Sequence, residues 1–199
     1  MNSPKRQTIL AGMLEAVGAE GYERVSVRSV LDRTGLYRQA FYDHFDDKAD
    51  CYLQAYDAGV ARVEALVLQA TAGQSSWVAR LRAGLDAGLG FFDAKPNTGR
   101  ALVVEVHAAG PEALAKRSAA MGRLVSFFAQ AQPLGGLDPP PPIASEGIAA
   151  GIQSVVHSRL ASRGSVDLRS LLPEFMYFAV LPYLGAEQAR AELRAPGVA

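Results

Sequence analysis

The sequence is poor in the residues that build disulfide-rich, metal-binding or membrane proteins. Cys51 is the single cysteine, which excludes an intramolecular disulfide bond. The three histidines, His44, His107 and His157, are scattered, and their spacing predicts no metal site. No apolar run reaches the roughly 20 residues of a transmembrane helix, and the N-terminus has no signal-peptide core. We therefore expect a cytoplasmic, non-membrane protein without a metal or other cofactor.

An excess of either charge is also missing, with 20 basic and 20 acidic residues in the chain. The first 50 residues hold seven basic and eight acidic side chains, a net charge of −1. Such a segment cannot bind nucleic acid through bulk charge, so any contact with DNA would depend on basic and donor groups gathered on one surface. The 199 residues are 49% apolar, which is enough for a buried core.

No segment has a convincing strand pattern, and almost all of the chain has the apolar spacing of amphipathic helices. Ser26 is a typical helix cap and Gly35 a typical helix stop. Pro173 either begins or kinks the last helix, and the proline-rich stretch 131–144 predicts a non-helical linker. The chain is therefore predicted to be all-α. The expected helices are 4–20, 26–34, 37–43, 47–71 (capped by Asp46 or Asp47), 77–94 (capped by Ser75 or Ser76), 98–108, 110–130, 145–162 and one within 167–184.

Two short predicted helices joined by a glycine turn, with a supporting helix before them, match the helix-turn-helix plan. Leu36 and Phe41 are expected to pack inward. Tyr37, Arg38 and Gln39 would then be exposed at the start of the second helix, the end that meets base edges in the major groove. Arginine can bind guanine and glutamine can bind adenine through paired hydrogen bonds. A short solvated helix explains these three residues equally well if they are taken alone.

Further donors near this helix favour DNA binding over the solvated-helix alternative. Tyr42, His44 and Lys48 offer hydrogen bonds to phosphates, which set register without reading sequence. Ser26 and Arg28 begin the preceding helix and are expected to face the same way. The glycine turn, the supporting helices and the ordered Tyr-x-His-Phe-x-x-Lys run together indicate a DNA-binding unit.

The segment RVSVRSVLDRTGLYRQAFYDHFDDKADCYLQAY resembles the DNA-binding domain of TetR-type transcriptional repressors. Ser26, residues 34–37 and residues 41–48 match the family pattern in order, and the alignment covers residues 6–56. Tyr37 and Gln39 replace a small residue and a common glycine, and Asp43 stands where a basic or neutral residue is frequent. The resemblance implies phosphate contacts from Ser26, Tyr42, His44 and Lys48, and base or groove contacts from Arg28, Tyr37, Arg38 and Gln39.

The same resemblance implies a two-part regulator. Residues 1–46 would form a three-helix helix-turn-helix head, and residues 47–199 a helical bundle for ligand binding and dimerisation. Two copies would pack through the helices near 145–162 and 167–184. The homodimer would bind a palindromic double-stranded DNA operator, act as a repressor, and be released by a small-molecule effector.

Aromatic and uncharged side chains in the predicted bundle suggest an apolar or aromatic effector, although most of them would serve equally well as core residues. No catalytic arrangement is visible, so we expect no enzyme. Cys51 is expected to be a small buried residue rather than a redox sensor. Two alternatives stay open: an all-α carrier or enzyme whose head is only structural, and a DNA-binding protein that senses no ligand. The candidate effector-binding residues are Trp77, Phe91, Phe92, His107, Met121, Phe128, His157 and Phe175.

Overall fold

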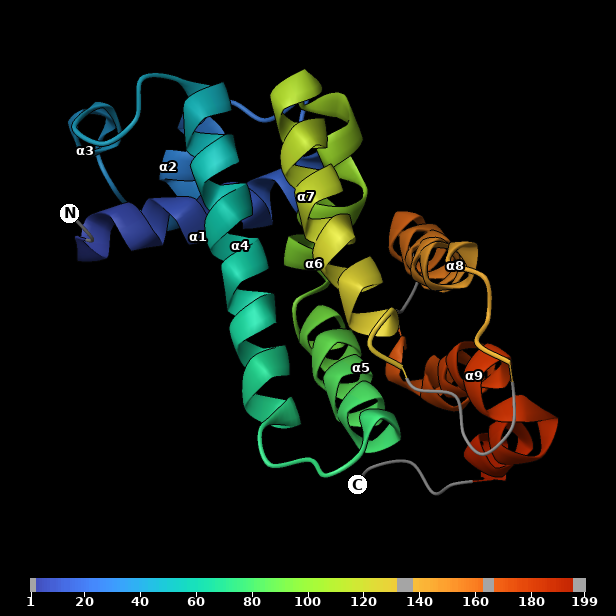
Figure 1. The fold of residues 1–199 in the computed structure, drawn as a ribbon. Helices are drawn as coiled ribbons and strands as arrows, with labels where there is room; N and C mark the ends of the chain where they lie inside the picture. Colours follow the sequence, from blue (N-terminus) through green and yellow to red (C-terminus); the bar gives the residue numbers. More distant parts are fainter. Residues whose placement is uncertain (1–2, 132–137, 163–166, 195–199) are drawn as a thin grey trace. The chain divides into compact units, whose positions relative to one another are not determined.

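A computed structural model describes residues 3–131, 138–162 and 167–194, and over these ranges the chain forms nine α-helices, two 3₁₀ helices and no strand (Figure 1). The predicted all-α fold is confirmed. The elements are α1 (Pro4–Glu20), α2 (Val27–Thr34), α3 (Arg38–Tyr42), α4 (Lys48–Thr71), α5 (Trp77–Ala94), α6 (Pro96–Val103), η1 (Glu105–Ala108), α7 (Pro111–Phe128), α8 (Ile143–Ala161), η2 (Arg169–Leu171) and α9 (Leu172–Arg194).

Local capping residues set the ends of the N-terminal helices, as the sequence predicted. The Ser26 hydroxyl accepts a hydrogen bond from the Ser29 backbone N–H at 3.1 Å, and the Ser29 hydroxyl accepts one from the Ser26 N–H at 3.0 Å. Gly35 ends α2 in the left-handed region at φ 67°, where a glycine has no steric penalty. The Asp47 carboxylate accepts from the Asp50 N–H at 2.8 Å and so caps α4.

Two predicted helices, over 98–108 and within 167–184, differ from the structure. The segment predicted as one helix over 98–108 is α6 followed by η1, and α6 already begins at Pro96 because proline suits a first helical turn. The third helix, predicted at about 37–43, spans Arg38–Tyr42, with Tyr37 and Asp43 as its flanking cap residues. The last helix runs to Arg194, well beyond 184, through a non-helical residue at Gly185 (φ 82°, ψ 174°).

Prolines decide two further boundaries. Pro173 lies in the first turn of α9, so it begins this helix and does not kink it. Part of the predicted linker 131–144 lies outside the described residues, namely 132–137; residues 138–142 are not helical, and α8 begins at Ile143.

The chain divides into two compact units that do not follow chain order. The first comprises Met1–Val63 and Lys95–Ser118, and the second Glu64–Ala94 and Ala119–Ala199. Both α4 and α7 therefore have one part in each unit. The predicted functional boundary at residue 46 falls inside the first unit and stays a prediction. The buried core of the first unit includes Ile9, Met13, Val17, Val30, Phe41, Phe45, Cys51 and Tyr52.

In the first unit, α1 packs on α2, α3 and α6. The approach of α1 to α6 is close, because a Cβ on Gly18 would lie 1.8 Å from the Asn97 carbonyl oxygen. Arg100 Nε donates to the Gly18 carbonyl at 3.0 Å. The Glu15 carboxylate accepts from Asn97 Nδ2 and from Thr98 Oγ1, both at 3.1 Å, at the N-terminal end of α6. Backbone contact and polar bonds thus hold α6 against α1.

In the second unit, α5 packs on η2 and α9, and α8 packs on α9. The Asp93 carboxylate of α5 accepts from the backbone N–H groups of Leu168 and Arg169 at 2.7 and 2.9 Å. The Arg169 guanidinium donates two bonds to Asp86 at 2.8 and 2.6 Å, and this carboxylate raises the pKa of Arg169. Two carboxylates of α5 therefore fix the start of α9. Among the described helices, none has the length and apolar composition that a membrane crossing requires.

Candidate DNA-binding surface

The candidate DNA-binding surface is built on α2, the Gly35 turn and α3. Phe41 of α3 is completely buried and packs against Phe45, with ring centroids 5.4 Å apart. Leu36 is half-buried in the turn. The predicted inward packing is therefore complete for Phe41 and partial for Leu36. This buried side fixes α3, so its opposite side faces solvent.

The three residues predicted to meet DNA bases are all exposed at the start of α3. Tyr37, the residue before the helix, is 86% exposed, and its side chain makes no capping hydrogen bond. Arg38 and Gln39 follow it in the first turn. Tyr42 is 47% exposed one turn later, and the guanidinium carbon of Arg38 lies 5.4 Å from its ring centroid. The surface thus combines two tyrosines, one cation and one amide.

The other predicted DNA-binding residues already have partners within the protein. Ser26 caps α2, as described above. Arg28 is exposed and pairs with Asp32 at 3.8 Å. His44 Nε2 lies 3.0 Å from the Ser3 hydroxyl. Lys48 Nζ donates to the Tyr22 carbonyl at 3.0 Å and lies 4.4 Å from the Tyr22 ring centroid.

Sequence reasoning found the exposed residues but missed these partners. Ser3 and Tyr22 lie 41 and 26 residues from His44 and Lys48 in the chain. No local pattern could have indicated such pairs. The contacts orient both side chains, and a lysine ammonium with one bond made still has two protons to donate.

A second layer of contacts supports this surface from α4 and η1. Arg6 Nη2 donates to Gln54 Oε1 at 2.5 Å, and Gln54 Nε2 donates to Asp50 Oδ1 at 2.8 Å, so α1 is bonded to the first turns of α4. The Tyr22 backbone N–H donates to Glu105 Oε2 at 3.0 Å. Burial, with a smaller contribution from the Asp47 charge, raises the pKa of Tyr22. The residue that holds Lys48 is therefore itself bonded to η1.

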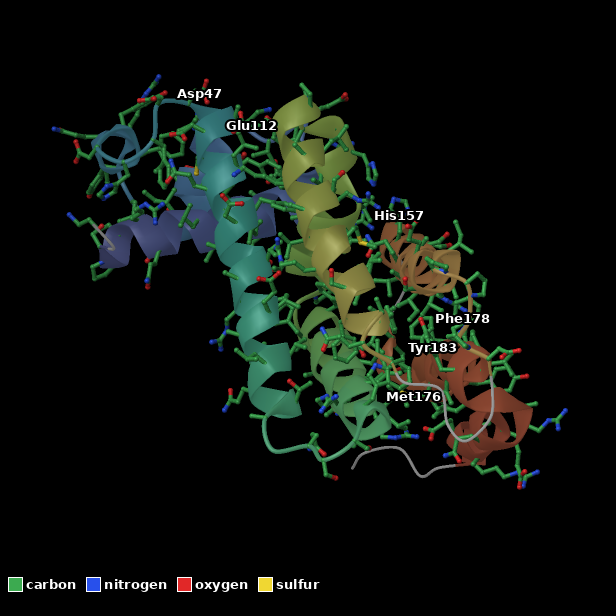
Figure 2. All side chains as sticks on the ribbon, viewed as in Figure 1. Asp47, Glu112, His157, Met176, Phe178 and Tyr183 are labelled. Carbon is green, nitrogen blue, oxygen red and sulfur yellow. The ribbon has the colours of Figure 1, made fainter. Side chains whose placement is uncertain are left out.

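The predicted effector-binding residues are spread over both compact units. Seven of the eight lie in the second unit; Phe128 and Phe175 are buried there and the other five are half-buried. His107 lies in the first unit, exposed on η1. Figure 2 labels His157 on α8 together with Met176, Phe178 and Tyr183 on α9. The Trp77 and Tyr183 rings join α5 to α9 with centroids 5.4 Å apart.

Sequence reasoning did not single out Arg82, which follows Trp77 by five residues in α5. Arg82 pairs with Glu192 of α9, and both side chains are largely buried. Within the described residues, Trp77 Nε1 and Arg82 Nη1 are buried donors without a hydrogen-bond partner. Over the same part of the chain, no group of three or more His, Cys, Asp or Glu is placed to hold a metal ion.

Comparison with known proteins agrees with this geometry. Residues 9–55 match the family described as bacterial regulatory proteins, tetR family. A comparison with curated protein sequences finds no match to this chain. Similar solved structures include the fatty acid degradation regulator FadR from Bacillus halodurans, with a TM-score of 0.77 and 14% identity over 90% of this chain and 96% of that one.

Two further solved structures have the same fold. The transcriptional regulator FadR from Bacillus subtilis, in complex with stearoyl-CoA, has a TM-score of 0.71 and 14% identity over 87% of this chain and 97% of that one. SmeT, the repressor of the Stenotrophomonas maltophilia multidrug efflux pump SmeDEF, has a TM-score of 0.69 and 18% identity, covering 89% of each chain. The match over residues 9–55, together with the helix-turn-helix geometry there, identifies this N-terminal segment as that of a tetR-type regulator, and the solved structures show that the chain shares their fold.

Proposed function

We propose that the chain is a ligand-responsive transcriptional repressor that binds a palindromic operator as a homodimer and is released by a small apolar or aromatic molecule. One observation carries the DNA-binding part of this proposal. Tyr37, Arg38 and Gln39 are exposed side by side where α3 begins, above a buried Phe41, inside the segment that matches the family. A recognition helix presents its N-terminal residues to base edges in this way.

The eight candidate residues divide into two roles. Arg38 and Gln39 are proposed to bind base edges, with Tyr37 and Arg28 beside them in the groove. The donors Ser26, Tyr42, His44 and Lys48 are proposed to bind phosphates and set the register of the head. Because the first 50 residues carry no net positive charge, this placement of donors has to supply the attraction that bulk charge does not.

Dimerisation through α8 and α9 is proposed because both helices expose apolar side chains. Phe178 of α9 is 44% exposed, and its ring lies over Gly151 of α8. Val155 is exposed one turn further along α8. Two helices from each copy would form a four-helix interface. Two heads held about 34–36 Å apart would then reach successive major grooves of one duplex.

The effector is proposed to bind in the second compact unit, between apolar side chains and the unpartnered donors of α5. A buried N–H group without an acceptor costs about 1–3 kcal/mol, so Trp77 Nε1 and Arg82 Nη1 favour a ligand that carries an acceptor. Stearoyl-CoA, present in the Bacillus subtilis FadR structure, has a long apolar chain and several acceptors. Helix α4 has residues in both compact units and is proposed to connect the effector site to the head. An effector that binds more tightly to one spacing of the two heads than to another shifts the population toward that spacing, and so changes the affinity for DNA.

The first test is selection of duplexes from a random DNA pool by the purified protein at several salt concentrations. Enrichment of a palindrome would support the dimeric regulator and provide a probe for effector screening by release. The double variant Arg38→Ala with Gln39→Ala should lose this preference with its fold intact by circular dichroism. No enrichment even at low salt, where phosphate contacts are strongest, would contradict the proposal and favour a carrier or enzyme whose head is structural.

A further inference from the structure

We propose that Tyr42 is a positioning residue for base recognition, which holds the Arg38 guanidinium and ties it to a phosphate of the DNA backbone. This inference rests on the proposed DNA binding and assigns a second role to a residue otherwise expected to contact phosphate alone. The pair lies on the exposed side of α3, at positions i and i+4, which are neighbours on a helix surface.

The geometry of the pair has two parts. The guanidinium carbon of Arg38 lies 5.4 Å from the centroid of the Tyr42 ring, within the range of a cation–π contact. Arg38 Nη2 also donates to the Tyr42 hydroxyl oxygen at 3.4 Å. One side chain therefore contacts the arginine through both its ring and its hydroxyl. An arginine has many rotamers in solution, and a fixed neighbour lowers the entropy that it loses when it binds a base.

Tyr42 is itself supported by the buried side of the helix. Its ring contacts Phe41 edge to face, with centroids 5.3 Å apart. Phe41 is fully buried and packs against Phe45. The order of contact therefore runs from the core through Phe41 to Tyr42 and then to Arg38. Tyr37 and Gln39 have no such connection among the described contacts, so Arg38 is the base-contacting side chain that the core orients.

The hydroxyl of Tyr42 can bind Arg38 and a DNA phosphate at the same time. A phenolic oxygen accepts one hydrogen bond while its own proton donates another. With Arg38 as donor to the oxygen, the proton remains available for a phosphate oxygen. A phosphate contact fixes the position of a helix along DNA. Because Tyr42 also contacts Arg38, it would hold the guanidinium at a fixed position relative to the base that it binds.

The test compares the sequence preferences of single variants on duplexes selected by the wild-type protein. Arg38→Ala identifies the base pair that Arg38 reads, where discrimination should fall by about 5- to 150-fold, the worth of a bidentate contact. Tyr42→Ala should lower discrimination at that same base pair by about 3- to 10-fold, since it removes a cation–π contact and a hydrogen bond. Tyr42→Phe keeps the ring, so it should keep more of the preference. The double variant Arg38→Ala with Tyr42→Ala should equal Arg38→Ala at that position, because the two effects are not independent.

Leu68→Ala is the control, since it truncates an exposed side chain of α4 outside the candidate DNA-binding surface and should leave discrimination at the base pair of Arg38 unchanged. If Tyr42 only binds phosphate, Tyr42→Ala should instead weaken binding to all duplexes equally, with little change in salt dependence because the phenol is uncharged. Unchanged discrimination in Tyr42→Ala, with Arg38→Ala defective, would overturn the positioning role and leave the proposed DNA binding intact. If the wild-type protein selects no duplex, the proposed function itself is contradicted. Comparing Tyr42 variants cannot give that result, so the two failures are distinguishable.

Discussion

At the scale of single residues, Tyr52 makes the stability of the first compact unit depend on pH. It is fully buried, and its hydroxyl donates to the Ala101 carbonyl of α6 at 2.8 Å. Burial, with smaller contributions from Tyr56, Glu105 and Tyr22, raises the pKa of Tyr52 well above its ordinary 10.0. Burial likewise raises the pKa of the Cys51 thiol above 9.0. The folded protein therefore keeps protons that the unfolded chain loses at alkaline pH.

The sign of the effect follows from this difference in bound protons. Stability from these two groups is complete below about pH 9 and falls as pH rises, because only the unfolded state releases protons there. We predict that Tyr52→Phe lowers the free energy of unfolding by about 1–2 kcal/mol at neutral pH, through the lost hydrogen bond. It should also make the decline above about pH 9 shallower. Urea denaturation at a series of pH values measures both, with the exposed Tyr37→Phe as control; a decline as steep as that of the wild type would contradict the prediction.

Side-chain exposure could be predicted from the sequence, whereas side-chain partners could not. The exposure of Tyr37 and the burial of Phe41 and Cys51 follow from position in a local pattern, and the structure confirms them. The bonds of His44 and Lys48 depend on how distant segments fold together. These hydrogen bonds can be identified only from the three-dimensional structure.

At the scale of helices, predictions succeeded where a local signal set the boundary. The reciprocal bonds of Ser26 and Ser29 and the left-handed Gly35 are such signals, and α2 begins and ends at them. The last helix was predicted within 167–184, and helical geometry does break at Gly185 (φ 82°, ψ 174°). The helical stretch beyond this kink, which runs to Arg194 and buries Ala189, was not predicted.

The contact of α1 with α6 offers a prediction at the same scale. A methyl group at Gly18 would lie 1.8 Å from the Asn97 carbonyl oxygen, which is backbone and cannot rotate away. Gly18→Ala should therefore separate the two helices and lower the free energy of unfolding by about 3 kcal/mol, the upper range for overpacking. Gly122→Ala is the control: nothing lies within 4 Å of its Cβ position in α7, and alanine in a helix interior gains up to about 1 kcal/mol. Thermal or urea unfolding measures both, and wild-type stability of Gly18→Ala would show that the helices are not in backbone contact.

At the scale of the whole molecule, the grouping of helices is what the sequence did not reveal. The predicted head, residues 1–46, shares a compact unit with α6, η1 and the start of α7, which begin about 50 residues after it in the chain. The bonds that join them, such as that from Thr98 to Glu15, connect residues 83 positions apart. The recognisable motif lies in residues 9–55, where the serine cap, the glycine turn and the Tyr-x-His-Phe-x-x-Lys run stand at fixed spacing. The later helices share only a pattern of apolar residues.

The proposed homodimer should be lost when the exposed apolar face of α8 and α9 receives a charge. Phe178→Asp replaces a ring that is 44% exposed in the single chain, so the fold should persist. In the dimer, the new carboxylate would be buried and unpaired within the interface, which covers about 800 Å² per partner in a standard complex. We expect a monomer by light scattering. Operator binding should weaken by at least about 30-fold, the effect of a hot-spot residue, because one head reaches a single half-site. Leu68→Asp, at a residue of α4 that is 72% exposed, is the control and should stay dimeric. A dimeric Phe178→Asp variant with normal operator binding would place the interface on other helices.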